Sequence, residues 1–363
     1  YSPSPVQAKV AHNIMNCKTG AYGANVCVCE DCGFVQIHYN SCRNRCCPMC
    51  QAVPKEMWMD ARREDVLDAP YFHLVFTVPD ILNPVIYSNQ RLLYDALYHA
   101  ASSTISELTA DPKHLGAKVG YICILHTWGS EMNFHPHIHT ILLGGGLASN
   151  NQWKDNGENF FLPIRVISKM FRGKYLEELK RLWEEDKLVF HGTAEKFRNH
   201  YTFKELLDSC YGMDWIPHCK KTFNGAQTVI KYLGKYTHRI AVSNHRIVRM
   251  DDDTVTFLVK DYRNEGQWKE LTISGVEFVR RFLMHVPPRR FVRIRHYGLL
   301  CSRTKSQKLT LCRNLLGCKK YLSKLRDMEM PEILEHLYGI KVCVCKACGG
   351  HLGKPQMRMP LRC

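Results

Sequence analysis

The chain has no long hydrophobic run and no leader-like start. Its most apolar stretch, Phe72 to Val85, is interrupted by Asp80 and prolines, and it is shorter than the roughly 18 residues of a membrane-spanning helix. The first ten residues, YSPSPVQAKV, lack the basic and apolar regions of a secretory signal. We therefore expect a cytoplasmic protein with no membrane contact.

Two common catalytic motifs are also missing. There is no GxSxG turn that would present a nucleophilic serine, and no GxxxxGK loop that would bind a nucleotide phosphate. A serine hydrolase and a P-loop nucleotidase are therefore disfavoured.

Acidic residues are outnumbered by basic ones. The 363 residues include 50 Lys and Arg against 34 Asp and Glu, a formal net charge of +16. The basic residues gather at Arg43 and Arg45, at Lys231 to Arg239, and at Pro287 to Gly298. Such clusters favour a polyanionic partner, because binding releases counterions from its phosphates.

The chain has 18 cysteines, which is many for a protein without a secretory signal. Eight lie between Cys17 and Cys50 and seven between Cys301 and Cys363. In a reducing compartment this pattern indicates metal sites at both ends rather than disulfides.

Two CxxC pairs near the N-terminus predict a zinc site. Fourteen residues separate the pair Cys29 and Cys32 from the pair Cys47 and Cys50. This is close to zinc-ribbon spacing, so we expect these four thiolates to share one ion. A second site would draw on the remaining cysteines of this region, with its fourth ligand open. Its candidates are Cys17, Cys42 and Cys46, with Cys27, His12 and His38 nearby.

A third zinc site is predicted at the C-terminus, from the CxxC pair Cys345 and Cys348. Its partner ligands stay open among Cys343, Cys363, Cys312 and Cys318. The sequence thus predicts one to three structural Zn²⁺ ions.

Helices alternate with antiparallel strand pairs, which predicts an α+β fold. Strands are expected at 71–79, 119–129, 135–146 and 215–223, and on either side of the acidic turn at 251–253. Helices are expected at 89–108, 167–183, 227–236, 278–285 and 306–316. We expect a zinc-binding DNA-recognition module at 1–60, a catalytic domain at 61–300, and a helical, cysteine-rich module at 301–363.

His137 and His139 lie two apart in a predicted strand, so both imidazoles point to the same face and can bind one metal ion. His135 shares that face but ranks lower as a ligand. A third donor is needed, and His126 on the neighbouring strand is favoured over Glu131 and Gln227.

Tyr232 and Tyr236 lie four apart in the predicted helix 227–236, so their hydroxyls share a face. An arbitrary tyrosine pair at this spacing is more often core packing. Here the neighbours Lys231, Lys235 and Arg239 make the surroundings cationic, as expected for DNA binding. A tyrosine beside a metal-bound phosphate can attack it and form a phosphotyrosine bond.

These segments together resemble the two-tyrosine rolling-circle transposases of the HUH superfamily, the family typified by insertion sequence ninety-one. The resemblance covers about residues 15–315. It rests on SCRNRCCPMCQ, YFHLVFTVP, LHTWGSEMNFHPHIHTILLGGGL, YLGKYTHRIAVSNHRI and FVRRFLMHVPPRRFVRIRHYGLL. One departure concerns Cys46, which stands where the family commonly has histidine.

The resemblance implies an HUH-type antiparallel sheet flanked by helices, after an N-terminal zinc-binding domain. It implies that His137 and His139 hold Mg²⁺ or Mn²⁺, and that Tyr232 and Tyr236 are paired nucleophiles forming 5′-phosphotyrosine intermediates on single-stranded DNA and transposon-end hairpins. Such a protein would be bacterial and associated with the nucleoid. Two alternatives remain: a rolling-circle replication initiator, and a non-catalytic zinc-bearing regulator derived from such an enzyme. The oligomeric state is not predicted.

Overall fold

The computed structural model describes residues 2–155, 162–215, 217–222, 229, 234, 241–261 and 264–358. Its centre is an antiparallel sheet with strand order β11-β4-β5-β3-β7, to which β6 is added by pairing with β5. The bounds of these strands are β3 (Tyr71–Thr77), β4 (Lys118–Trp128), β5 (Phe134–Leu147), β6 (Trp153–Asp155), β7 (His218–Thr222) and β11 (Ile294–Gly298). The predicted α+β class is confirmed, and so are the expected strands.

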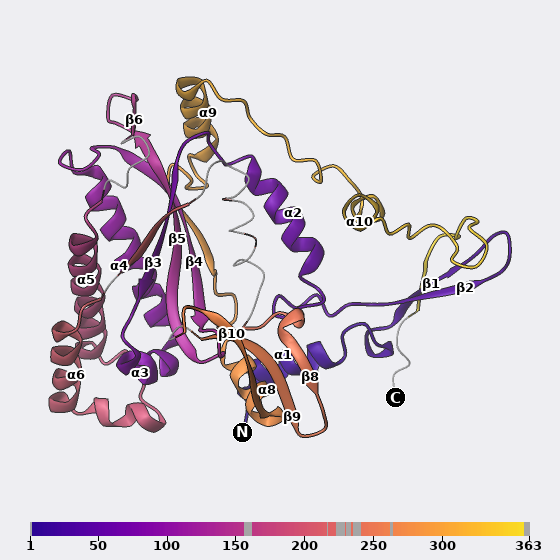
Figure 1. Ribbon diagram of the computed structural model, residues 1–363, viewed down its shortest axis with the longest axis horizontal. Coiled ribbons are helices and arrows are strands. Elements are labelled where there is room, and N and C mark those ends of the chain that lie inside the picture. The colour runs from indigo at the N-terminus through magenta and orange to yellow at the C-terminus, as the bar shows by residue number, and fades with distance from the viewer. Residues whose placement is uncertain are drawn as a thin grey trace.

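One face of this sheet is covered by helices, as Figure 1 shows at the left. Alternate residues of β3 (Phe72, Leu74 and Phe76) join the core formed with these helices. The helices are α4 (Gln90–Ala110), α5 (Ile164–Glu184) and α6 (His200–Gly212), with the short α3 (Asn83–Ser88) beside them. This layer contains the largest apolar cluster among the described residues.

The opposite face carries the other set of alternating residues. Tyr71, Ile122 and Ile141 pack there with Met59 of α2 (Ala52–Arg63), and with Leu309 of α9 (Lys305–Leu316). Strands β4 and β5 form the expected hairpin, closed by the Gly129 N–H donating to the Asn133 carbonyl at 3.1 Å.

A second antiparallel sheet, β10-β9-β8, lies below the first in Figure 1. Its strands are β8 (Ile247–Met250), β9 (Thr254–Asp261) and β10 (Gln267–Ser274). Helix α8 (Gly275–Met284) begins at Ser274, whose hydroxyl caps the Glu277 N–H, and packs with α1 (Pro5–Met15) against this sheet.

The third sheet combines both ends of the chain. Strand β1 (Ala24–Val28) pairs with β2 (Val35–Tyr39) on one side and with β12 (Gln356–Arg358) on the other, all antiparallel. The chain reaches β12 from α9 through α10 (Met330–Tyr338), along the extended path at the right of Figure 1. The two cysteine-rich regions, expected as separate modules, therefore meet in one sheet.

The structure describes only part of the elements expected near residues 215–236. The strand predicted at 215–223 begins at His218, and the helix predicted at 227–236 lies outside the described residues except for Val229 and Gly234. No helix of the described residues is long and apolar enough to cross a membrane.

Candidate metal centres and nucleic-acid interface

Three histidines converge on the sheet face that packs against α2 and α9. His137 and His139 alternate on β5, and His126 on β4 is directly opposite His137 in the strand register. One ring nitrogen from each imidazole lies within 4.8 Å of one nitrogen from each of the others, and the Nε2 atoms of His137 and His139 are 3.1 Å apart. Two nitrogens each about 2.1 Å from one ion, at right angles, would be about 3 Å apart, so this donor set fits a shared metal.

These imidazoles are buried, and burial favours their neutral form. The exposed fractions are 4% for His126, 8% for His137 and 9% for His139. Burial, followed by the neighbouring His135, lowers the pKa of His137 to about 3. Burial and the His126 imidazole hold the pKa of His139 well below its ordinary value. Neutral imidazole is the form that coordinates metals, so His137 and His139 can act as ligands at neutral pH.

A fourth buried histidine, His73 on β3, was not predicted. Its Nε2 lies 2.9 Å from His139 Nδ1, and the two rings stack at 5.1 Å between centroids. This contact leaves His139 Nε2 facing His137. The missed signal is the strand alternation, because Tyr71 and His73 share the face that carries His139 once β3 pairs with β5.

The rival ligands stand outside the three-histidine group or outside the described residues, although the His135 ring lies beside that of His137, with 5.2 Å between the centroids. His135 contacts the Asp80 carboxylate at 3.2 Å near the surface. Glu131 is engaged with Asn133 in the β4–β5 connection. Gln227 lies outside the described residues, so among the described candidates His126 is the one brought to His137 and His139.

Tyr232, Tyr236, Lys231, Lys235 and Arg239 lie outside the described residues. Two residues of that region are described. Val229 is 2% exposed and packs with Ile122 and Ile141 on the face that carries the histidines. Gly234 lies against Met59 of α2, where a β-carbon would come within 1.9 Å of the sulfur.

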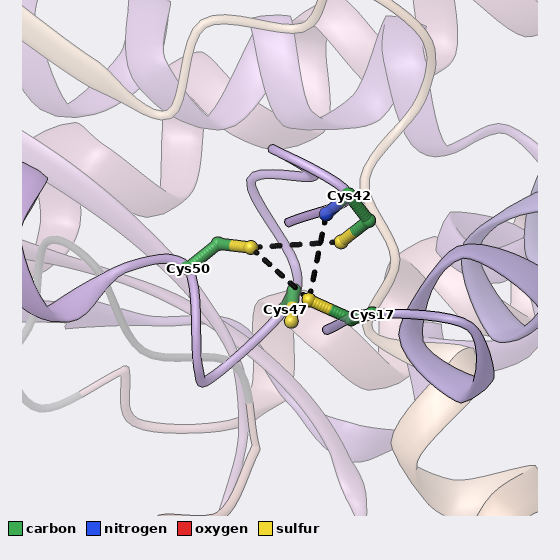
Figure 2. A group of neighbouring side chains, drawn as sticks. All are labelled: Cys17, Cys42, Cys47 and Cys50. Atoms are coloured by element: carbon green, nitrogen blue, oxygen red, sulfur yellow. Dashed lines mark hydrogen bonds between the residues drawn. The ribbon is translucent and has the colours of Figure 1, made fainter. Parts of the chain in front are cut away.

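Four cysteines of the N-terminal region form one cluster, drawn in Figure 2: Cys17, Cys42, Cys47 and Cys50. Cys50 Sγ is 3.5 Å from Cys17 Sγ and 3.6 Å from Cys42 Sγ. Cys17 follows α1 and Cys50 precedes α2, so an ion here would hold both helices to the loop between them.

A second cluster joins the other CxxC pair to the C-terminus: Cys29, Cys32, Cys345 and Cys348. The prediction that Cys29 and Cys32 share an ion with Cys47 and Cys50 is therefore wrong, although every one of these residues lies in a four-cysteine cluster. Cys29 and Cys32 lie in the turn between β1 and β2, where Cys29 pairs with Leu352 of the C-terminal segment, and β2 separates them from Cys47 and Cys50.

Cys46 belongs to neither cluster, so its prediction as a ligand is wrong as well. Its side chain is 4% exposed and packs in the apolar cluster with Val10 and Val286. Cys47, the next residue, faces the other sulfurs, so the two successive side chains point in different directions.

Comparison with known proteins agrees with the resemblance. Residues 120–308 match a family described as "Putative transposase", and residues 1–78 match one described as "Transposase zinc-binding domain". The "Putative transposase y4qJ" of Sinorhizobium fredii (strain NBRC 101917 / NGR234) is 39% identical over 96% of this chain and 88% of its own length. The "Transposase for insertion sequence element IS801" of Pseudomonas savastanoi pv. phaseolicola is 30% identical over 84% of this chain and 72% of its own.

The chain belongs to this transposase family. The matched zinc-binding domain includes Cys17, Cys42, Cys47 and Cys50, so the N-terminal module of this transposase binds zinc. Among solved structures, one described as "Conjugative Relaxase Trwc In Complex With Orit DNA. Metal-Bound Structure" is similar over 46% of this chain and 70% of its own. Its TM-score is 0.27 and its sequence identity is 13%.

The basic residues of the transposase divide into two groups. Arg45 donates to the Phe291 and Pro288 carbonyls at 2.7 and 2.9 Å, so this predicted DNA contact fastens the zinc module to the core. Arg295 pairs with Asp95, and its guanidinium lies 3.9 Å from the Tyr98 ring centroid. These two guanidinium groups stabilise the fold.

Other cations remain at the surface. Arg43 is exposed, and so are Arg289 and Arg290. A cleft of about 470 Å³ lies between α1, the zinc-binding loop and the basic run, and no carboxylate is among its lining residues. It is lined by Lys9, Arg45, Arg289 and Arg290, together with Pro5, Val6, Val10, Asn44, Cys46, Val286 and Pro287.

Proposed function

We propose that this transposase nicks and rejoins single-stranded DNA through 5′-phosphotyrosine intermediates, in rolling-circle transposition. The observation that carries the proposal is the convergence of three buried histidines, His126, His137 and His139, on one face of the sheet. A structural role would not require three buried imidazoles facing one another, since burial of each polar ring costs hydrogen bonds to water.

The three histidines would hold a divalent ion, Mg²⁺ or Mn²⁺, and such an ion polarises a scissile phosphate and offsets the charge that develops on it. Imidazole suits transition ions better than Mg²⁺, so we expect the site to prefer Mn²⁺. His73 would keep His139 in the tautomer whose Nε2 is available as a ligand.

Tyr232 and Tyr236 would be the nucleophiles. One tyrosine oxygen bonds to the phosphorus as the bond to the 3′-oxygen breaks, which leaves a 3′-hydroxyl and a 5′-phosphotyrosine. Attack by a 3′-hydroxyl on that phosphotyrosine reverses the bonding and rejoins the strand. The position of Val229 on the histidine face supports this assignment, because Val229 precedes Tyr232 by three residues.

The DNA would be bound by phosphate contacts. The basic cleft next to the zinc module supports this proposal, since its exposed arginines can reach a phosphate backbone. We propose transposon-end hairpins and single strands as its ligands, with splayed bases read by the zinc module.

A nicking assay on single-stranded oligonucleotides, with Mn²⁺ or Mg²⁺, tests the proposal. His137→Ala combined with His139→Ala should abolish cleavage and leave DNA binding intact, because cations supply most of the affinity. The matched control is His135→Ala. It removes a neighbouring ring that contacts Asp80, and it keeps the backbone carbonyl that bonds to His137 Nδ1, so this variant should cleave normally.

Cleavage by the double variant would refute the metal site. Cleavage without rejoining to a second end would favour the replication initiator. DNA binding without any cleavage by the unmodified protein would favour the non-catalytic regulator.

A further inference from the structure

The turns around Cys29 and Cys345 have the same backbone hydrogen bonds. The Cys29 N–H donates to the Phe34 carbonyl at 2.9 Å, and the Gly33 N–H donates back to the Cys29 carbonyl at 3.1 Å. The two corresponding bonds around Cys345 measure 2.8 and 2.9 Å. Gly33 and Gly349 both have positive φ, at 70° and 79°, so each CxxCG sequence closes with a glycine that this turn requires.

The sulfur atoms of the two turns are spaced for a tetrahedral ion. Cys29 Sγ lies 3.6 Å from Cys348 Sγ, and Cys32 Sγ lies 3.8 Å from Cys345 Sγ. Zinc–sulfur bonds of about 2.3 Å place the corners of a tetrahedron about 3.8 Å apart. A disulfide would need about 2.05 Å, so the spacing fits a shared metal rather than a covalent bond.

The surrounding unit has little core of its own. Its buried apolar cluster consists of Cys27, Cys29, Cys345 and Leu352. Backbone contacts add the β1–β12 pairing and the Gly353 N–H donating to the Val28 carbonyl at 2.9 Å. A unit with so little apolar burial commonly depends on a metal to fold.

We propose that Cys29, Cys32, Cys345 and Cys348 bind a second structural zinc ion, which joins the N-terminal and C-terminal segments of the transposase. Two of its four ligands lie outside the matched zinc-binding domain, which ends at residue 78. The site is also distinct from the Cys17 cluster, because no cysteine belongs to both.

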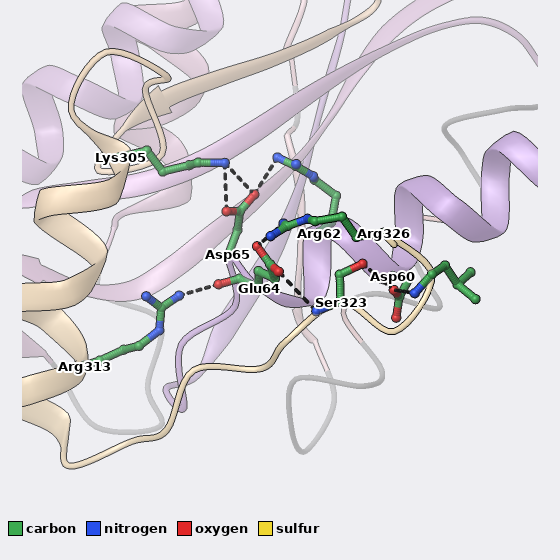
Figure 3. Close-up of polar contacts among 9 residues, drawn as sticks. Asp60, Arg62, Glu64, Asp65, Lys305, Arg313, Ser323 and Arg326 are labelled. Atoms are coloured by element: carbon green, nitrogen blue, oxygen red, sulfur yellow. Dashed lines mark hydrogen bonds and ion pairs between the residues drawn. The ribbon is translucent and has the colours of Figure 1, made fainter. Parts of the chain in front are cut away.

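The C-terminal segment is attached to the rest of the protein at two places, and this zinc ion would form the attachment nearer the C-terminus. The other attachment is to α2 and the residues after it, drawn in Figure 3, where Asp60 accepts from the Ser323 hydroxyl at 2.6 Å and Glu64 pairs with Arg326 at 2.6 Å. Between these attachments the chain carries α10. Loss of the zinc would free the segment after the attachment to α2 and remove β12 from the N-terminal sheet.

Zinc counted per full-length chain tests the shared site. The unmodified protein should hold two ions. Cys29→Ser with Cys32→Ser should hold one, and Cys345→Ser with Cys348→Ser should hold one. The four-cysteine variant should also hold one, because both pairs serve the same ion. Cys343→Ser is the matched control: this exposed cysteine lies outside both clusters, and two ions should remain.

Limited proteolysis supplies a second readout. In both pair variants the chain beyond Arg326 should become sensitive to the protease. This includes the variant of Cys29 and Cys32, which lie far from that segment in sequence. Two zinc ions retained by the Cys345/Cys348 variant would overturn the proposal. The proposal would also be overturned if the four-cysteine variant lost more zinc than either pair variant. An unchanged pattern of proteolysis after replacement of Cys29 and Cys32 would overturn it as well. None of these readouts depends on DNA cleavage, so the site and the proposed activity succeed or fail separately.

Discussion

At the scale of single residues, the proposed metal ligand His139 has a buried partner, His73, outside the three-histidine group. His73 contacts His139 through the nitrogen opposite the one that faces His137. In metal sites such a contact sets the tautomer and the ring orientation of the ligand. The role assigned to His73 is therefore positioning.

We predict that His73→Ala weakens Mn²⁺ binding about 10- to 100-fold, because loss of an outer hydrogen bond to a ligand typically costs that much. Calorimetric titration with Mn²⁺ measures the change, and nicking should recover at high Mn²⁺. His73→Gln, which can still hydrogen-bond, should lose less. Equal affinity in His73→Ala and the unmodified protein would exclude the positioning role.

A second prediction at this scale concerns which tyrosine attacks the DNA. Four residues of helix would place Tyr232 and Tyr236 about 6 Å apart along the axis, so both could serve one metal ion. Each single Tyr→Phe variant should keep some nicking yet fail in complete transposition, while the double variant forms no covalent adduct. Peptide mass spectrometry of the trapped 5′-phosphotyrosine locates the attacking residue. An adduct confined to Tyr232 would leave Tyr236 a structural or phosphate-binding role.

At the scale of elements, α2 lies between the N-terminal cysteine cluster and the C-terminal segment. The Asp60 carboxylate, 5% exposed, accepts hydrogen bonds from Tyr321, Ser323 and the Leu325 N–H at 2.6, 2.6 and 2.9 Å. Burial raises the pKa of Asp60, but hydrogen bonds from Ser323 and Tyr321 outweigh it and hold the pKa below its ordinary value.

We predict that Asp60→Ala destabilises the docking of the C-terminal segment by about 2 kcal/mol, the usual contribution of hydrogen bonds to a charged group. Hydrogen exchange at residues 319–326 measures the change. Asp111→Ala, at the end of α4 and away from this contact, is the control.

This contact also predicts a pH dependence. Because the folded-state pKa of Asp60 is lowered, its stabilisation is fully present above the unfolded-state pKa of about 3.9 and is lost as the pH falls through the lower folded value. Protection of residues 319–326 should therefore be constant near neutrality and fall only in acid. A loss of protection between pH 6 and 8 would point to another group.

At the scale of the whole molecule, the basic cleft lies where the zinc module meets the core. We predict that Arg289→Ala with Arg290→Ala weakens binding to all single-stranded sequences alike. The slope of log affinity against log salt should fall by roughly 1.4, since each phosphate contact on single strands contributes about 0.7. Fluorescence anisotropy at several salt concentrations measures the slope.

The matched control removes the same charge from the helical layer. Lys180→Ala with Lys187→Ala changes two exposed lysines of α5 and the loop after it, which pair with Glu184 and Glu185. This variant should keep the unmodified slope. Equal slopes for all three proteins would place the DNA elsewhere on the surface.

Local pattern was enough to predict the central strands and helices and the histidine pair. Alternation of side chains along β3, β4 and β5 is a property of each strand alone, so the face shared by His137 and His139 can be read from spacing of two. The short polar connection at 130–133 joined β4 to β5 as a hairpin, and that register brought His126 to the pair.

Only the tertiary structure decided which groups meet across the chain. CxxC spacing identifies a turn that presents two thiolates, but it does not identify the second turn, and nearness in sequence favoured Cys47 and Cys50 for Cys29 and Cys32. The shared CxxCG sequence of the turns at Cys29 and Cys345 was the available clue. His73 and Cys46 depended likewise on packing, because strand pairing and burial in a core are set by neighbours distant in sequence. The local sequence therefore determines each turn that presents two thiolates, and the tertiary fold determines which two turns come together.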